Sequence, residues 1–215
     1  MSETCQIVPL GDHAMLVQFG STMDDGANRR AQVLARALLA DPIAGAIEIV
    51  PSLVSVLVRY DPGRVGPVRL ASEIGLRLSK KADSSVTTHR ISVRFGGADG
   101  PDLEDLAAGL KLGPAEFIKQ HCAAPLRILA TGFAPGFVYC GFHPPGLNVP
   151  RRQQVRPRVP AGSVLFAAGQ TAIAATDIPT GWHVIGRTEF RNFDPELMPP
   201  TQLVAGDEVL FEALA

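Results

Sequence analysis

The sequence has 215 residues, of which 46% are hydrophobic and 19% are charged, and its formal net charge is -1. This composition is typical of a globular protein, and the length suffices for one large domain or two small ones. With 20 basic and 21 acidic residues, no global field attracts the chain to nucleic acid or to an anionic membrane, so any basic site must be local.

The N-terminal residues lack the charged and then apolar pattern of a secretory signal, and no apolar run reaches the roughly 18 residues that span a bilayer. The three cysteines, Cys5, Cys122 and Cys140, have neither a disulfide-type nor a zinc-type spacing, and the five histidines form no HExxH pattern. We therefore expect a cytoplasmic protein without a bound metal.

Residues 1–80 predict a small α+β unit of two hairpins and two helices. Apolar runs flank a Gly-Asp turn at residues 11–12, and period-two runs flank Pro51-Ser52, which predicts the hairpins. A helical pattern follows Thr22, the candidate N-cap, and a second covers residues 68–78.

The polar, aperiodic stretch at residues 79–89 predicts a domain boundary, which gives domains at residues 1–83 and 84–215. Beyond it, a strand precedes two short helices, each opened by a proline (Pro101 and Pro114) in its first turn. Many short apolar runs separated by Gly/Pro turns then indicate a β-barrel or sandwich. The predicted fold class is therefore α+β.

Residues 131–142, TGFAPGFVYCGF, combine glycines with aromatic side chains. Glycine allows a close backbone approach and a positive φ, and aromatic rings form the walls of pockets. No dinucleotide fingerprint or P-loop is present. Two interpretations stay open, namely a ligand pocket and an aromatic plug at one end of the barrel.

Residues 150–160, PRRQQVRPRVP, contain four arginines between prolines. Proline removes backbone donors, so the segment is expected to be an extended edge or rim. Arginine forks suit carboxylate or phosphate oxygens, but a solvated loop whose arginines satisfy nearby carboxylates explains the pattern equally well. Nucleic acid is rejected because the other basic residues are scattered.

Four further residues are candidates for a site, and each also has a purely structural interpretation. Gln170 and Thr171 lie between apolar runs, where they either satisfy a turn or face a substrate amide. His121 ends a predicted helix, where the macrodipole favours its cationic form, so it is the best candidate acid or base or else a capping residue. Trp182 precedes a Gly-Arg-Thr run at residues 186–188.

In chain order, the motifs GDHAMLVQFG, GFAPGFVY, PRRQQVRPRVPAGSV, GQTAI and PTGWHVIGRT resemble the PxpB/KipI family of 5-oxoprolinase components, also described as allophanate hydrolase subunit 1-like. The resemblance runs from about residue 11 to the C-terminus. It implies a small α+β domain followed by a cyclophilin-like barrel.

The resemblance also implies an activity. Family members with a PxpC-like and a PxpA/LamB-like partner form an ATP-dependent 5-oxoprolinase, a lactam hydrolase that opens 5-oxo-L-proline to L-glutamate. On this basis His121 and Arg152 are the predicted catalytic residues. The predicted substrate-binding residues are Phe133, Pro135, Gly136, Phe137, Tyr139, Arg151, Arg158, Gln170, Thr171, Trp182 and Arg187.

Three arginines of the rim would hold a carboxylate or phosphate, Gln170 and Thr171 the ring amide, and His121 would transfer a proton. The chain departs from the family pattern beside this pocket at Val138, Cys140, Phe142 and His143, so another substrate stays open. Two alternatives also stay open: an inhibitor of a histidine kinase, and a protein related to urea-type carboxyltransferases.

Overall fold

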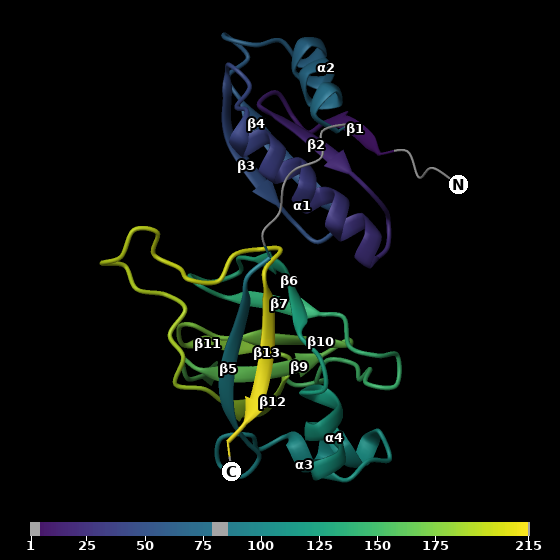
Figure 1. Cartoon of the computed structure of the whole chain (residues 1–215), viewed down its shortest axis with the longest axis vertical. Coiled ribbons are helices and arrows are strands. Elements are labelled where there is room, and N and C mark those ends of the chain that lie inside the picture. Colours follow the sequence, from purple (N-terminus) through teal and green to yellow (C-terminus); the bar gives the residue numbers. More distant parts are fainter. Residues whose placement is uncertain (1–4, 79–85, 215) are drawn as a thin grey trace. The chain divides into compact units, whose positions relative to one another are not determined.

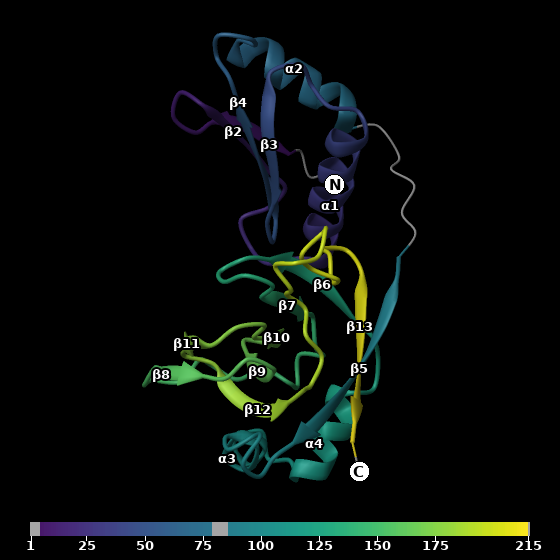
Figure 2. The same ribbon diagram turned by 90° about the vertical axis from the view of Figure 1, so that its left-hand side faces the viewer.

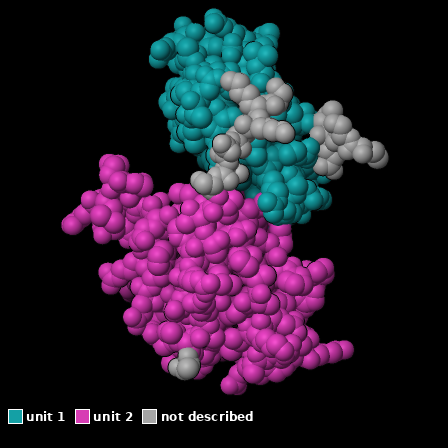
Figure 3. All heavy atoms as spheres, in the orientation of Figure 1, with its two compact units in different colours: residues 1–85 teal, residues 86–215 magenta. Residues whose placement is uncertain are grey.

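The computed structural model describes residues 5–78 and 86–214, and the chain splits into two compact units, Met1–Ser85 and Val86–Ala215 (Figure 1, Figure 3). The predicted boundary between residues 83 and 84 lies outside the described residues. No helix within the described ranges is long and apolar enough to cross a membrane.

The first unit is a four-stranded antiparallel sheet with the order β1-β2-β4-β3 and two helices on one face (Figure 2). Both predicted hairpins and both predicted helices are confirmed. In chain order, its elements are β1 (Gln6–Pro9), β2 (Ala14–Gln18), α1 (Asp25–Ala40), β3 (Ala46–Pro51), β4 (Ser55–Tyr60) and α2 (Pro67–Leu78).

The start of α1 differs from the prediction, because the N-cap is Asp24 and not Thr22. The Asp24 carboxylate accepts a hydrogen bond of 2.6 Å from the backbone N–H of Ala27, which satisfies a donor that the first turn leaves unpaired. Leu34 and Leu70, one on each helix, are fully buried in the core of this unit.

The second unit is a closed barrel of seven strands in the order β10-β7-β6-β13-β5-β12-β9. Within the barrel, β13 pairs with β5 in parallel and the other neighbours are antiparallel. The barrel strands are β5 (Thr88–Phe95), β6 (Leu126–Thr131), β7 (Val138–Gly141), β9 (Ser163–Ala167), β10 (Gln170–Ile173), β12 (His183–Arg187) and β13 (Glu208–Ala213). The α+β class with a C-terminal barrel is confirmed.

Strand β9 shows how the sequence builds two apolar layers. Val164 and Phe166 belong to the main core, whereas Leu165 and Ala167 belong to a second cluster that includes Trp182. Alternate residues of a strand point to opposite faces, so this strand packs on both sides. Its continuous apolar run therefore reflects burial on both faces.

Two short helices lie together beyond one end of the barrel, α3 (Leu103–Gly109) and α4 (Pro114–His121) (Figure 1). Pro114 is the first residue of α4, as predicted, but Pro101 precedes the N-cap of α3 and is not helical. Phe117 of α4 is fully buried in the barrel core.

The arginine-rich segment forms strand β8 (Arg156–Val159), which pairs with β11 (Ile178–Thr180) in a separate two-stranded sheet. The prolines of this segment predict an edge position, and the pairing of β8 with a single neighbour confirms it.

Candidate functional site

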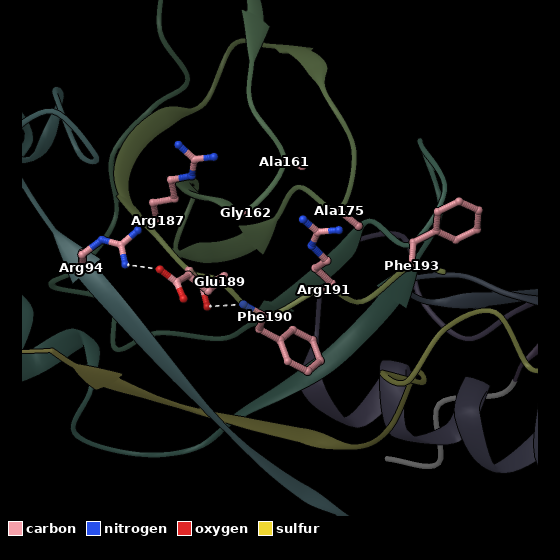
Figure 4. A pocket seen from close by; sticks show the side chains of 10 residues that line it. Arg94, Ala161, Gly162, Ala175, Arg187, Glu189, Phe190, Arg191 and Phe193 are labelled. Atoms are coloured by element: carbon pink, nitrogen blue, oxygen red, sulfur yellow. Dashed lines mark hydrogen bonds and ion pairs between the residues drawn. The ribbon is translucent and has the colours of Figure 1, made fainter. Parts of the chain in front are cut away.

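The second unit contains a cavity of about 690 Å³ with a basic lining (Figure 4). Arg94 comes from β5 and Arg187 from the end of β12, and the turn at Ala161-Gly162 precedes β9. The remaining lining residues are Ala175, Thr188, Glu189, Phe190, Arg191 and Phe193. Its volume is within the range of about 300–1,000 Å³ that is usual for small-molecule sites.

Two of the three arginines in this cavity lack a bonded counter-charge. Arg94 lies directly opposite Arg187 on the neighbouring strand, an arrangement of like charges that is unfavourable by itself. Arg94 bonds to Asp99 at 2.8 Å and to Glu189 at 2.9 Å. Among the described residues, the guanidinium groups of Arg187 and Arg191 make no hydrogen bond or ion pair. The cavity is therefore suited to an anion.

Gly162 fixes the turn that separates Arg187 from Arg191 in Figure 4. Its φ of +84° lies in the left-handed region, and a Cβ there would come within 2.3 Å of the carbonyl oxygen of Thr188. The N–H of Gly162 donates to Ala174 at 2.7 Å, and its carbonyl accepts from Thr188 at 2.8 Å. These bonds hold the turn against the end of β12.

The glycine–aromatic motif packs behind the same cavity. Gly136 has a φ of +67°, and a Cβ on it would lie 2.6 Å from the Cβ of Phe193. The side-chain amide of Asn192 donates to the carbonyl of Gly136 at 2.8 Å. Pro135, next to it, is exposed. The motif therefore supports the wall that Phe193 and Ala175 provide.

The aromatic residues of the motif form a chain of ring contacts. Ring centroids are 5.4 Å apart between Phe133 and Phe137, 4.8 Å between Phe137 and Tyr139, and 5.9 Å between Tyr139 and Trp182. The guanidinium of Arg151 lies 5.8 Å from the Trp182 ring centre. Burial raises the pKa of Tyr139, and Arg151 opposes this shift only in part. Five predicted site residues therefore lie together.

The other arginines of the rim are ion-paired. Arg152 and Arg156 share the buried carboxylate of Asp102, and Arg158 bonds to Asp177 at 2.8 Å. Of the two interpretations that the sequence left open, these contacts favour arginines that satisfy nearby carboxylates. Arg158 also lines a smaller cavity beside the first.

Two histidines meet one hydroxyl in the barrel interior. The Nε2 atoms of His121 and His143 each lie 2.8 Å from Oγ1 of Thr171, and all three side chains are buried. The hydroxyl can donate to one ring and accept from the other. Burial lowers the pKa of His121 well below 6.5, and the proximity of His143 lowers it further.

His121 is therefore neutral at pH 7, and the expectation of a cationic ring at the helix end is wrong, because desolvation outweighs the macrodipole. Burial also lowers the pKa of His143, to about 4. The thiol of Cys140 is buried too, which raises its pKa to about 12 and makes it a poor nucleophile.

The folded protein should lose stability as the pH falls below 6.5. The unfolded chain then binds protons at His143 that the folded chain rejects until about pH 4. His143 alone should lower the free energy of unfolding by about 1.4 kcal/mol between pH 8 and pH 5.5. Urea denaturation of wild type and His143→Gln at both pH values measures this, and equal pH slopes would contradict it.

The structure does not bring all predicted site residues to one place. Arg187 lines the large cavity, His121 and Thr171 lie inside the barrel, and Gln170 is buried at the start of β10. The sequence did not single out Arg94, Arg191 or Asp102, and it singled out His143 only as a departure from the family pattern. Arg191 lies only four residues after Arg187 in the sequence, and this spacing was a signal that could have identified it.

The protein therefore combines a small α+β sheet with a closed barrel, and the barrel unit carries an arginine-lined cavity whose charge suits an anion. The chain belongs to the family of the carboxyltransferase domain, subdomain C and D, whose model matches residues 5–203.

Relatives sharpen this assignment. The chain is 35% identical to the B subunit of 5-oxoprolinase from Bacillus subtilis (strain 168), over 98% of this chain and 93% of the relative. It is 31% identical to the corresponding 5-oxoprolinase protein of Escherichia coli O157:H7, over 94% of this chain and 93% of that one. The solved structure of TTHA0988 is 33% identical with a TM-score of 0.84 over 94% of this chain, which spans only 40% of that longer chain.

Proposed function

We propose that this chain is the PxpB-type component of an ATP-dependent 5-oxoprolinase that opens 5-oxo-L-proline to L-glutamate. Its near full-length similarity to 5-oxoprolinase proteins supports the proposal. The observation that carries it is the pair of guanidinium groups, Arg187 and Arg191, without a bonded counter-charge in a cavity of about 690 Å³. A lactam with one carboxylate fits such a site.

In this reaction the arginines can bind the two anionic reactants and stabilise the negative charge that develops on the amide oxygen. Ring opening adds one water across the amide C–N bond and leaves a carboxylate and an amine, while a second water cleaves ATP to ADP and phosphate. The amide is unreactive, so negative charge that develops on its oxygen must be stabilised. Both reactants are anions, and a guanidinium can bind either a carboxylate or a phosphate.

The proposal assigns supporting and binding roles to the predicted residues. Arg152 supports the site through Asp102, and Arg151 with Trp182 and Tyr139 supports its aromatic wall. Proton transfer by His121 stays a prediction, as does amide binding by Gln170 and Thr171.

The proposal includes partners, a PxpC-like and a PxpA/LamB-like protein. In the solved TTHA0988 chain, the part similar to this chain makes up only 40% of the polypeptide, which supports a barrel that works beside further protein. We expect the chain alone to be inactive. Its free cysteines, Cys5, Cys122 and Cys140, agree with a reducing cytoplasm.

Co-expression tests the proposal directly. The chain should co-purify with PxpC-like and PxpA-like proteins of the same genome, and the complex should release glutamate from 5-oxoproline only when ATP is present. Omission of this chain is the control and should abolish the release. A complex that forms but leaves 5-oxoproline intact would overturn the assignment.

A further inference from the structure

A second, smaller cavity of about 160 Å³ lies beside the large one. Pro160 and Ser163 line the small cavity, whereas Ala161 and Gly162 of the same turn line the large one. Arg187 lines both. The turn therefore separates two chambers, and one guanidinium serves both of them.

The small cavity carries an excess of positive charge. Its wall includes Arg156, Arg158 and Arg187, together with one acid, Asp99. Asp99 is bonded to Arg94, and Arg158 to the carboxylate of Asp177, so these charges are compensated.

The positive charges of the other two arginines, Arg156 and Arg187, are not fully balanced by acids. Arg156 shares the single carboxylate of Asp102 with Arg152, so two positive charges meet one negative charge. Arg187 has no hydrogen-bonded or ion-paired acid in the part of the chain that the structure describes. Glu189 is bonded to Arg94 as well, so the five arginines and four acids of this network leave about one positive charge around the small cavity.

One buried donor also lacks an acceptor. Nε of Arg156 is shielded from solvent and has no hydrogen-bond partner among the described residues. Nε of Arg152, which shares Asp102 with Arg156 but lines neither cavity, is unpartnered in the same way, so this atom reflects the shared carboxylate and not the cavity. Arg156 therefore contributes its charge, and not this buried atom, to the small cavity.

We propose that the small cavity binds a phosphate-sized oxyanion, held by Arg156, Arg158 and Arg187. Its volume of about 160 Å³ accommodates a tetrahedral oxyanion. Phosphate carries about one to two negative charges at neutral pH and therefore matches the excess.

The identity of the oxyanion rests on the proposed function, in which ATP cleavage releases phosphate, while the existence of the site does not. Arg187 then lies between the chamber of the lactam and the chamber of the phosphate. A residue that contacts both ligands holds the lactam and the phosphate close together, and such proximity accelerates a reaction between two bound groups.

The test uses inorganic phosphate and the full chain in a chloride buffer. Titration followed by ¹H–¹⁵N NMR should shift the amide signals of Asp99 and Ser163 in a saturable way. Arg156→Gln and Arg187→Gln should each weaken phosphate binding about tenfold, the usual loss for one charge-assisted hydrogen bond. Arg158→Gln, at an exposed side chain, should weaken it less and provides a variant that leaves the fold intact.

Arg90→Gln is the matched control, because Arg90 is exposed on β5 and lines neither cavity. It should bind phosphate as the wild type does. An absence of saturable shifts, or equal affinity in all four variants, overturns the proposal. Tighter binding of acetate than of phosphate also overturns it, since the site then selects a carboxylate. Phosphate binding by the chain, together with no glutamate release from the complex that it forms with its PxpC-like and PxpA-like partners, would refute the proposed function and leave the subsite standing.

Discussion

Asp102→Ala is expected to lower the free energy of unfolding by about 3–5 kcal/mol, the usual cost of removing one partner from a buried ion pair. The lower end of this range applies, because the side chains of Arg152 and Arg156 remain 26% and 33% exposed, so water screens part of the freed charge. Alanine would leave these two guanidinium groups side by side with no acid between them.

The position of Asp102 explains the size of this effect. Its side chain is only 8% exposed, and its second oxygen accepts from the N–H of Val184 at 2.8 Å. Burial alone would raise the pKa of this carboxyl, but the Val184 amide and the two arginines outweigh burial and lower it. Asp102 makes no side-chain capping bond to α3, so loss of a cap is not part of the expected cost.

Urea denaturation at pH 7 measures this prediction, and Asp177→Ala is the matched control. Asp177 pairs with Arg158 and accepts from the N–H of Ala161 at 2.9 Å, but these contacts are exposed, so its removal should shift the unfolding midpoint much less. Asp102→Asn keeps the shape and removes the charge, and it should lie between wild type and Asp102→Ala. Equal midpoints for the Asp102 and Asp177 variants would show that the buried pair contributes nothing.

The sequence predicts the elements of this protein well because their signals are local. Period-two runs beside Pro51 define a hairpin, and Pro114 marks the first turn of a helix. The predicted N-cap of α1 lies two residues too early, since Thr22 and Asp24 are both good capping residues and only the local backbone decides between them.

The candidate site is harder to predict because its parts are distant in the chain. Arg94 and Arg187 become neighbours only when β12 pairs with β5, and Asp102 reaches Arg152 across 50 residues. A cluster such as PRRQQVRPRVP predicts an acidic partner but does not identify it. Here two of its arginines share a structural carboxylate, and Arg151 lies against the Trp182 ring. The arginines of the large cavity come from other segments of the chain.

For His143, the sequence suggested a role that the structure does not support. It departs from the family pattern beside the predicted pocket, which suggested a change of substrate. In the structure its ring bonds to Thr171 inside the barrel, next to His121. The residue that suggested a change in specificity is therefore a packing and hydrogen-bonding residue of the core, because its partner Thr171 lies 28 residues further along the chain.

Within the proposed 5-oxoprolinase complex, Arg187→Ala is expected to lower kcat/KM for 5-oxoproline about 100-fold. A hydrogen bond to a charged group contributes about 1.5–3 kcal/mol, and about 2.7 kcal/mol corresponds to about 100-fold in rate. Arg191→Ala should lower it only about tenfold, because Arg191 is exposed to water whereas Arg187 is partly buried. Steady-state glutamate release from the reconstituted complex measures both values.

A lactam without a carboxylate separates the two arginines. We assign the substrate carboxylate to Arg191, because Arg191 lines only the large cavity. With 2-pyrrolidinone, which lacks this carboxylate, Arg191→Ala should therefore react as the wild type does. Arg187→Ala should remain slow, because Arg187 also lines the small cavity. Arg90→Ala, outside both cavities, should leave both substrates unaffected. If Arg191→Ala slows both lactams equally, Arg191 acts without the carboxylate, and its assigned role is wrong.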